Sequence, residues 1–355
     1  MRKRNLLLPI ILVIFLPLVW GAVPIAENTT LTSTYGTDYT TENLTLFWDV
    51  YDGDGDPIKN ITNWRLDGSP IMVLNMPFEG GSNATFTKDY SGYGNNGTVN
   101  GATWNSTGGY DGWGAYEFDG VNDGIDISDS SSLSNLSTVT VEAWIKLDAY
   151  TATGTYPNDV ETIVTKYTWA SGYGGFDLAI DGGKNPGFLI FNGQSYDFAN
   201  ASETVSLNTW YHLVGTYDGT TIKIYVNGVL KNTTNYPEGN LNSSGTNLEI
   251  GSQGNTREFN GTIDEVRIYN QVLSEEQIKA LYENKTDLIV SQETSVGDVW
   301  QGCVTPNDGT SDGNESCSNS LTIQSPPVPE FSDYAILLIL VMVGGGFLWI
   351  RKKEA

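Results

Sequence analysis

A short loop in the first third of the chain carries oxygen donors at close spacing. It runs from Asp89 to Gly97 with the sequence DYSGYGNNG. Ca²⁺ prefers six to eight hard oxygen ligands, and a glycine-rich loop with Asp and Asn side chains can supply carboxylate, amide and carbonyl oxygens together. The loop is therefore a candidate calcium site. The alternative is that Asp89 and Asn95 only form Asx turns within a tight loop.

Nucleophilic catalysis has little support in this sequence. A serine or cysteine triad needs a histidine base, and His212 is the only histidine in the chain. It lies within a predicted hairpin, where a structural role is the favoured interpretation. A glycosidase needs two opposed carboxylates in a cleft, but no motif singles out such a pair among the 42 acidic residues. We therefore expect a protein without catalytic residues, one that is not an enzyme.

Two cysteines lie close together near the C-terminal end, Cys303 and Cys317. The segment between them contains PNDG and SDG, which are turn signals. Two strands that fold back at this turn would bring the sulfurs together, so we predict a disulfide formed in an oxidising compartment. A loop of this size would stabilise the fold by about 3 kcal/mol in the chain-entropy model. A metal site on the two thiolates lacks a nearby histidine.

The composition describes the scaffold that must position these groups. The chain has 355 residues, a formal net charge of −24 and only 18 Lys and Arg. Nucleic acids and anionic membrane faces bind basic patches, so the charge argues against both as partners. With 10 Trp, 19 Tyr and 12 Phe the chain is not an acidic disordered tail. Forty glycines between aromatic and β-branched runs indicate an all-β protein.

The middle of the chain, residues 71–283, is predicted to consist of short antiparallel strands. Residues 137–147 alternate, with Val139, Val141, Ala143, Ile145 and Leu147 on one face. A hairpin is expected from residues 210–217 and 221–226 around an Asp-Gly-Thr turn, followed by a second turn at Asn-Gly 227–228. Ser274-Glu-Glu-Gln277 is a capping box that predicts a short helix. This order suits a two-sheet jelly roll.

Four motifs in this region resemble those of laminin-G-like (concanavalin A-like) jelly-roll domains. They are DYSGYGNNG from residue 89, YEFDGVND from residue 116, WYHLVGTYDG from residue 210 and GTIDEVRIYN from residue 261. Gly124 departs from the pattern, since the family often has an aromatic residue there. The resemblance implies a structural calcium held by Asp89, Asn95 and Asp264, with loop carbonyl groups near Gly92. It also implies a lectin, an adhesion module or a lectin-like domain.

The two flanks of this region are predicted to form one further domain. Residues 27–70 and 284–324 are each too short for a sandwich, but together they approach the size of an immunoglobulin-like domain. Their segments resemble the two halves of an immunoglobulin-like repeat of archaeal surface proteins, with the jelly roll inserted between two strands. A cysteine that often pairs across such repeats is replaced here by Leu46. Asp52, Asp54 and Asp56 in the first flank favour a solvated turn over a calcium loop.

The two ends of the chain are predicted to be targeting or membrane segments. Residues 1–22 have the basic start and apolar run of a signal peptide. A proline-rich stalk at 325–333 precedes an apolar segment at 334–350, long enough for a transmembrane helix at the short end of the range, and a basic cluster follows. Pro329-Glu-Phe before this segment resembles the PEF-type sorting signal of archaeal surface proteins, which would replace the helix by a lipid. Retention of the helix is the alternative.

These features predict a calcium-stabilised protein of the cell surface, anchored to the cytoplasmic membrane, that binds surface glycans or other cell-surface molecules. Thirteen N-x-S/T sequons fit a secreted glycoprotein. Trp104, Trp113 and Trp169 are candidates for stacking on sugars, although core positions are the commoner alternative. The rival predictions are a structural envelope component without a soluble ligand and, more weakly, a glycan-processing enzyme. Fold alone does not decide among them.

Overall fold

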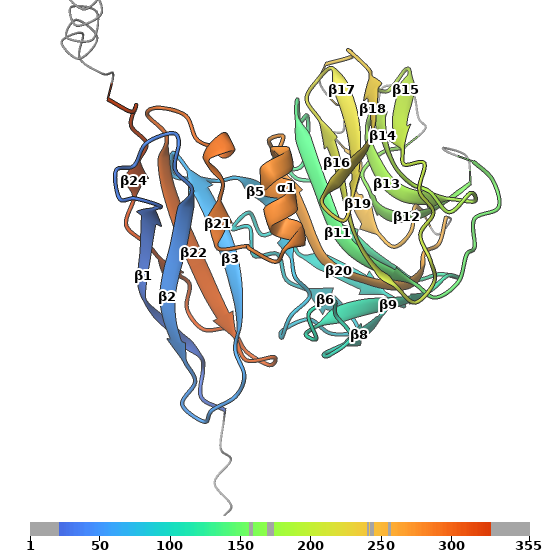
Figure 1. Cartoon of the computed structure of the whole chain (residues 1–355). Helices are drawn as coiled ribbons and strands as arrows, with labels where there is room; N and C mark the ends of the chain where they lie inside the picture. Colours follow the sequence, from blue (N-terminus) through green and yellow to red (C-terminus); the bar gives the residue numbers. More distant parts are fainter. Residues whose placement is uncertain are drawn as a thin grey trace, which may run out of the picture.

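The computed structural model describes residues 21–155, 159–168, 174–239, 241, 245–254 and 257–327. Within these ranges two β-rich modules lie side by side with a short helix between them (Figure 1). In these described ranges we find no helix with the length and apolar character needed to cross a membrane. The predicted transmembrane helix, residues 1–20 of the predicted signal peptide and residues 328–333 of the predicted stalk lie outside the described residues.

The larger module corresponds to residues 71–283 and contains two antiparallel sheets. The spatial order of the first sheet is β15 (Tyr196–Asn200), β14 (Pro186–Phe191), β13 (Gly175–Asp181), β12 (Val160–Thr165), β19 (Leu248–Ile250), β10 (Gly124–Ile127), β7 (Gly97–Asn100) and β6 (Phe86–Thr87). The order of the second is β18 (Val229–Asn235), β17 (Thr221–Val226), β16 (Trp210–Tyr217), β11 (Val139–Leu147), β20 (Asn260–Tyr269), β9 (Ala115–Asp119) and β8 (Thr103–Asn105), with β5 (Met72–Met76) also paired to β20.

The main core lies between these two sheets and is apolar. It contains Val141 and Ile145 of β11 and, from the opposite sheet, Phe188 of β14. Gly215 of β16 permits this close packing, because a Cβ atom there would lie 2.2 Å from the ring of Phe188. The prediction of an all-β, jelly-roll-like architecture is thereby confirmed.

Local sequence signals act as expected in this module. The hairpin of β16 and β17 turns at Asp218, whose Oδ1 accepts hydrogen bonds from the backbone N–H groups of Thr220 (2.8 Å) and Thr221 (2.7 Å). Helix α1 (Glu275–Tyr282) begins after Ser274, whose side chain accepts a hydrogen bond from the N–H of Gln277. The helix follows β20 directly and leads the chain into the smaller module.

The smaller module is built from both flanks of the chain. One sheet has the order β1 (Ile25–Ser33), β2 (Leu44–Tyr51) and β21 (Leu288–Ile289), and the other contains β23 (Ser316–Cys317), β22 (Val299–Asn307), β3 (Lys59–Leu66) and β4 (Ser69–Pro70), with β24 (Leu321–Thr322) on β22. Pairing of β3 with β22 joins the two flanks, and Cys303 forms a disulfide with Cys317 across β22 and β23. That this module is of immunoglobulin type stays a prediction.

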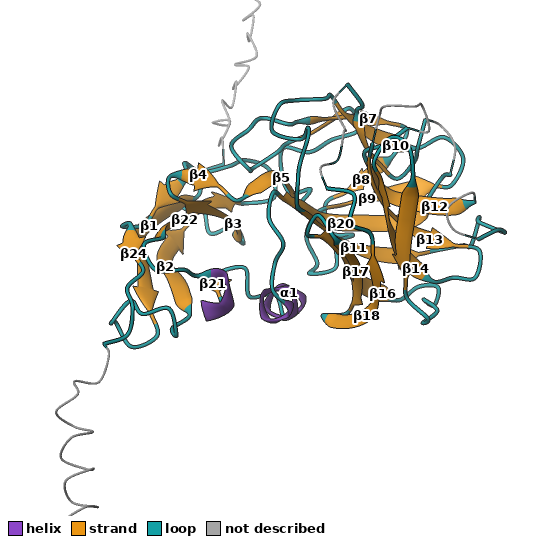
Figure 2. Cartoon of the chain, turned by 90° about the horizontal axis from the view of Figure 1, so that it is seen from above, coloured by secondary structure: helices purple, strands orange, loops and turns teal. Residues whose placement is uncertain are grey.

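A second hydrophobic cluster joins the two modules. It includes Trp300 of β22, Ile278 of α1 and Tyr225 of β17. Figure 2 shows α1 between the smaller module and the sheet that contains β16 and β17. Because this face of the sheet is covered, Glu142 and Trp144 of β11 are buried although they point away from the main core.

Candidate functional site between the two modules

A cavity of about 420 Å³ lies where the two modules meet. Its wall combines β2 and β3 of the smaller module with β5, β20 and the loop between β8 and β9 of the jelly roll. Its lining residues include Trp48, Lys59, Asn60, Asn75, Asp111, Trp113, Glu265, Arg267, Asn284 and Asp287. The set mixes aromatic, amide and charged side chains.

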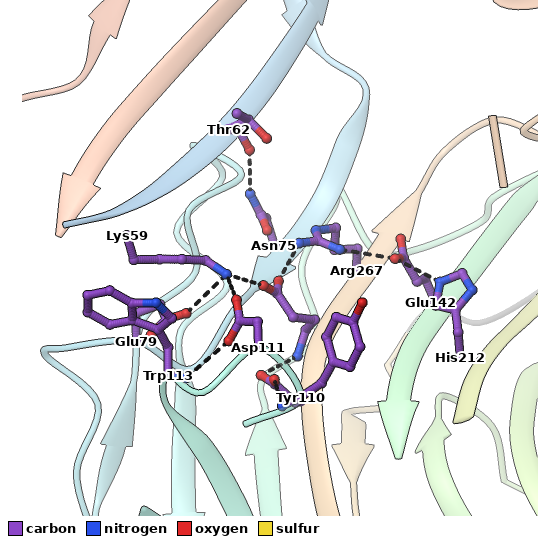
Figure 3. Close-up of polar contacts among 12 residues, drawn as sticks. Lys59, Thr62, Asn75, Glu79, Tyr110, Asp111, Trp113, Glu142, His212 and Arg267 are labelled. Atoms are coloured by element: carbon purple, nitrogen blue, oxygen red, sulfur yellow. Dashed lines mark hydrogen bonds and ion pairs between the residues drawn. The ribbon is translucent and has the colours of Figure 1, made fainter. Parts of the chain in front are cut away.

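The ammonium group of Lys59 is the centre of an ion cluster at this cavity (Figure 3). Lys59 opens β3 in the smaller module, whereas its carboxylate partners belong to the larger one. Its Nζ lies 2.8 Å from Oε1 of Glu265 and 3.6 Å from Oε1 of Glu79, and it also pairs with Asp111. Burial lowers the pKa of Lys59, but the three carboxylates outweigh burial and raise it. The lysine therefore stays charged and links the modules.

The carboxyl groups around Lys59 differ in whether they carry a proton at neutral pH. Oxygen atoms of Glu79, Asp111 and Glu265 lie within 4.8 Å of one another. Burial raises the pKa of Glu79 to about 8, and the pairing with Lys59 offsets this only in part. Burial also acts to raise the pKa of Glu265, but Arg267 and Lys59 outweigh it and lower that pKa. Glu79 thus holds its proton at neutral pH while Glu265 is ionised, and the lysine ammonium sits among the three groups.

A β-bulge in β20 places Glu265 at the cluster. The register with β11 shifts between Glu142, opposite Arg267, and Trp144, opposite Asp264. Glu265 occupies the shifted segment with a φ of 52°, which is uncommon for a residue other than glycine. Bulges re-aim side chains, and strained backbone is concentrated at functional sites. The bulge brings Glu265 within reach of both Lys59 and Arg267.

A buried polar chain runs from this cluster into the jelly roll. Arg267 pairs with Glu265 and donates to Oε1 of Glu142 at 3.0 Å, and Nε2 of His212 lies 3.0 Å from that same oxygen (Figure 3). The hydroxyl of Tyr269 donates to the other oxygen of Glu142 at 3.3 Å. His212 is fully buried. These contacts support the structural role predicted for His212.

The uncharged part of the cavity wall is suited to a polar ligand. Trp48 and Trp113 line the cavity and are half-buried. The backbone N–H of Trp113 donates to Oδ1 of Asp111 at 3.1 Å, which fixes the loop that carries both residues. Asn75 donates through Nδ2 to the carbonyl of Thr62, but its Oδ1 and that of Asn60 have no hydrogen-bond partner among the described residues. Buried acceptors of this kind are normally satisfied.

The predicted calcium ligands occupy two different environments. Oδ1 of Asp89 accepts from the N–H groups of Asn75 and Ser91, and Oδ2 accepts from the N–H of Asn95 and the hydroxyl of Ser91, at 2.7–2.9 Å. Both oxygens are thus engaged inside the loop. Asp264 instead accepts from the N–H of Tyr110 and faces the Lys59 cluster, and burial together with nearby carboxylates raises its pKa well above the ordinary value.

As placed, Asp89, Asn95 and Asp264 do not fit one calcium site within the described part of the chain. Both oxygens of Asp89 accept hydrogen bonds inside the loop, and both oxygens of Asp264 accept hydrogen bonds from backbone N–H groups, those of Tyr110 and Glu265. The Asx-turn alternative accounts for Asp89 more directly. Calcium binding by this protein stays a prediction.

Replacing Asp89 by alanine should lower the free energy of unfolding by about 3 kcal/mol, because buried backbone N–H groups would lose their acceptor. Urea unfolding in EDTA and in millimolar calcium should give the same loss. Asp126→Ala, which removes an exposed partner of Asn100, is the matched control and should have little effect. A calcium-dependent stabilisation of the parent protein that Asp89→Ala abolishes would contradict this and support the metal site.

The three tryptophans that were candidates for stacking on sugars differ in their surroundings. Trp113 lines the cavity. Trp104 packs against the main core and donates through Nε1 to the carbonyl of Phe78 at 2.8 Å, so it is structural. Trp169 lies outside the described residues. Sequence reasoning missed the ion cluster of Lys59, Glu79, Asp111 and Glu265. The one available signal was the acidic and basic run 264–267 inside an otherwise apolar strand.

Comparison with known proteins supports the architecture of the larger module. Residues 119–279 match the family described as the concanavalin A-like lectin/glucanases superfamily. The match and the two-sheet architecture agree on a concanavalin A-like, jelly-roll-like fold for this module. The match contains Glu142, His212 and Glu265 but not Lys59 or Asp111. No curated protein matches the chain.

Similar solved structures come from bacterial proteins. The binding domain of Paraclostridial Mosquitocidal Protein 1 is 18% identical with a TM-score of 0.50, and the alignment covers 60% of this chain and 52% of that one. Domain 4 of AbnA, an extracellular arabinanase of Geobacillus stearothermophilus solved with arabinotriose, is 22% identical over 59% of this chain and 98% of that one, with a TM-score of 0.47. The botulinum neurotoxin serotype G binding domain is 21% identical over 60% and 51%, with a TM-score of 0.48.

This chain spans about half the length of the mosquitocidal and botulinum domains. At such low identity the likeness concerns the fold alone.

Proposed function

We propose that this protein is a non-enzymatic binding protein and that the cavity between its two modules takes a carbohydrate. The observation that carries the proposal is the cavity itself, in which Trp48 and Trp113 stand beside amide and carboxylate groups. Its volume of about 420 Å³ falls within the range of small-molecule sites. The family match of the jelly roll supports the same class of function.

The side chains of the cavity wall are complementary to the chemical groups of a sugar. An indole ring offers a large apolar face to the C–H groups of a pyranose. Asp111 and Asp287 line the cavity and are half-buried, so a ligand hydroxyl group can donate a hydrogen bond to either carboxylate. A ligand rich in hydroxyl groups therefore suits this cavity better than an apolar one.

The ion cluster supports binding rather than hydrolysis. A glycosidase must bring one protonated and one ionised carboxyl group to the two sides of a glycosidic bond. Glu79 is the protonated candidate, but its side chain is only 2% exposed and the ammonium of Lys59 lies 3.6 Å from it. The same ammonium pairs with Asp111 and Glu265. All three carboxyl groups are therefore occupied by the ammonium group of Lys59, and none of them is free to act on a glycosidic bond.

Trp113→Ala should weaken binding of the sugar by at least about tenfold, equivalent to about 1.4 kcal/mol, because the stacking surface is lost. A glycan array would identify the ligand, and isothermal titration would give the affinity. Tyr196→Ala removes an exposed aromatic residue of β15 that does not line the cavity, and it should leave binding unchanged. Failure of the parent protein to bind any glycan would contradict the proposal and favour a structural envelope component.

We also propose that the protein is displayed at the cell surface and held by residues 329–353. The support is the sequence pattern of a signal peptide at one end and an apolar segment followed by basic residues at the other. Deleting residues 331–355 should release the protein into the medium, which cell fractionation would measure. Retention of the truncated chain on the membrane after cleavage of the signal peptide would contradict this anchor.

A further inference from the structure

We infer that the cavity between the modules selects uncharged sugars and excludes acidic ones such as sialic and uronic acids. This inference rests on the proposed function, because it names the class of carbohydrate that the same site takes. It follows from the charges that face the cavity and from the partners that those charges already have.

Negative groups outnumber positive ones on the cavity wall. Asp111, Glu265 and Asp287 line it, against two cations, Lys59 and Arg267. Asp287 is half-buried, and within the described residues it forms no ion pair. The whole chain has the same sign, with a formal charge of −24, so its field also repels anionic ligands.

Both cations on the cavity wall already have carboxyl partners. Lys59 pairs with the carboxyl groups of Asp111, Glu265 and Glu79. Arg267 pairs with Glu265 and with the fully buried Glu142. The side chains of Lys59 and Arg267 are only 14% and 10% exposed. A sugar carboxylate would have to compete with these protein carboxyl groups for two cations that are already paired and largely buried, and it would lose its own hydration on the way.

Uncharged hydroxyl groups meet no such obstacle. The carboxylates of Asp111 and Asp287 are hydrogen-bond acceptors on the cavity wall, and a hydroxyl group can donate to either of them. A carboxylate on the ligand has no proton to donate and would meet these acceptors with like charge. Specificity of this kind arises from repulsion of the wrong ligand as much as from attraction of the right one.

The test uses pairs of glycans that have the same number of sugar residues and differ in a carboxylate. Suitable probes are tetragalactose with tetragalacturonate, together with further neutral and oxidised pairs from the array. The protein should be made in a host without N-glycosylation, because Asn60 and Asn284 are both sequon residues and both line the cavity. Affinities are compared at low salt and at about 0.15 M salt.

The neutral member of a pair should bind at least about tenfold more tightly than the acidic member, and added salt should narrow the difference. Asp287→Lys should reduce the ratio of the affinity for the neutral glycan to the affinity for the acidic one severalfold. Asp148→Lys makes the same change of total charge at an exposed position outside the cavity and should leave the ratio unchanged. If Asp287→Lys fails to fold, Asp287→Asn, which removes the negative charge without adding a positive one, takes its place and should change the ratio in the same direction.

Two outcomes would overturn the inference, and they are distinguishable. If an acidic glycan binds as tightly as its neutral counterpart, or if Asp148→Lys changes the ratio as much as Asp287→Lys, the selectivity is wrong while the sugar site stands. If no glycan of either kind binds, the proposed function fails and the inference fails with it.

Discussion

Replacing Lys59 by methionine should lower the free energy of unfolding by about 3–5 kcal/mol, the range for removing one partner of a buried ion pair. The reason is that Glu265 and Asp111 would keep their charges at the module interface without the ammonium that now pairs with both. Methionine retains most of the side-chain volume, so the loss would report charge rather than packing. Urea unfolding followed by tryptophan fluorescence would measure it.

The matched control for this substitution is Lys223→Met. Lys223 pairs with the exposed Glu275 of α1 at 3.5 Å, and exposed pairs contribute at most about 1 kcal/mol. Lys59→Arg, which keeps the charge, should recover part of the lost stability. Equal effects of Lys59→Met and Lys223→Met would contradict the assignment of Lys59 as the cation that links the modules.

Stability should fall as the pH rises from about 5 to about 8, with the buried carboxyl group of Glu79 as a main cause. Burial raises the pKa of Glu79 from its ordinary 4.5 to about 8. Between these values the folded chain holds a proton that the unfolded chain releases, so the folded state binds more protons and loses stability as the pH increases. The stabilisation that the protonated Glu79 contributes is fully present below about pH 4.5, and it is lost as the pH rises to about 8.

The magnitude follows from the size of the shift. At 1.36 kcal/mol for each pKa unit, Glu79 alone accounts for up to about 5 kcal/mol across this range. Asp177 adds to the same trend, because burial raises its pKa to about 7 despite the nearby Arg257. Urea unfolding at several pH values would measure the slope. Glu79→Gln should flatten it, whereas Glu276→Gln on the exposed side of α1 should not, and an unchanged slope in Glu79→Gln would refute the assignment.

The amino-acid sequence by itself determined the local structure of this protein. The alternation of residues 139–147 matches β11, the Asp-Gly-Thr turn matches the hairpin of β16 and β17, and the capping box begins α1 at Glu275. The two cysteines on either side of a turn are joined. Each of these signals is local, because side-chain periodicity, turn geometry and helix caps depend on residues a few positions apart.

Only the tertiary structure decided which polar residues act together. Lys59 and Glu265 lie in different modules and are 206 residues apart in sequence, so no motif connects them. The alternation of β11 places Glu142 on the face of the sheet that points away from the main core. It did not indicate that α1 and the smaller module would cover this face and bury Glu142. Long-range packing, together with a bulge at Glu265, assembled the cavity from side chains whose local sequences carry no sign of it.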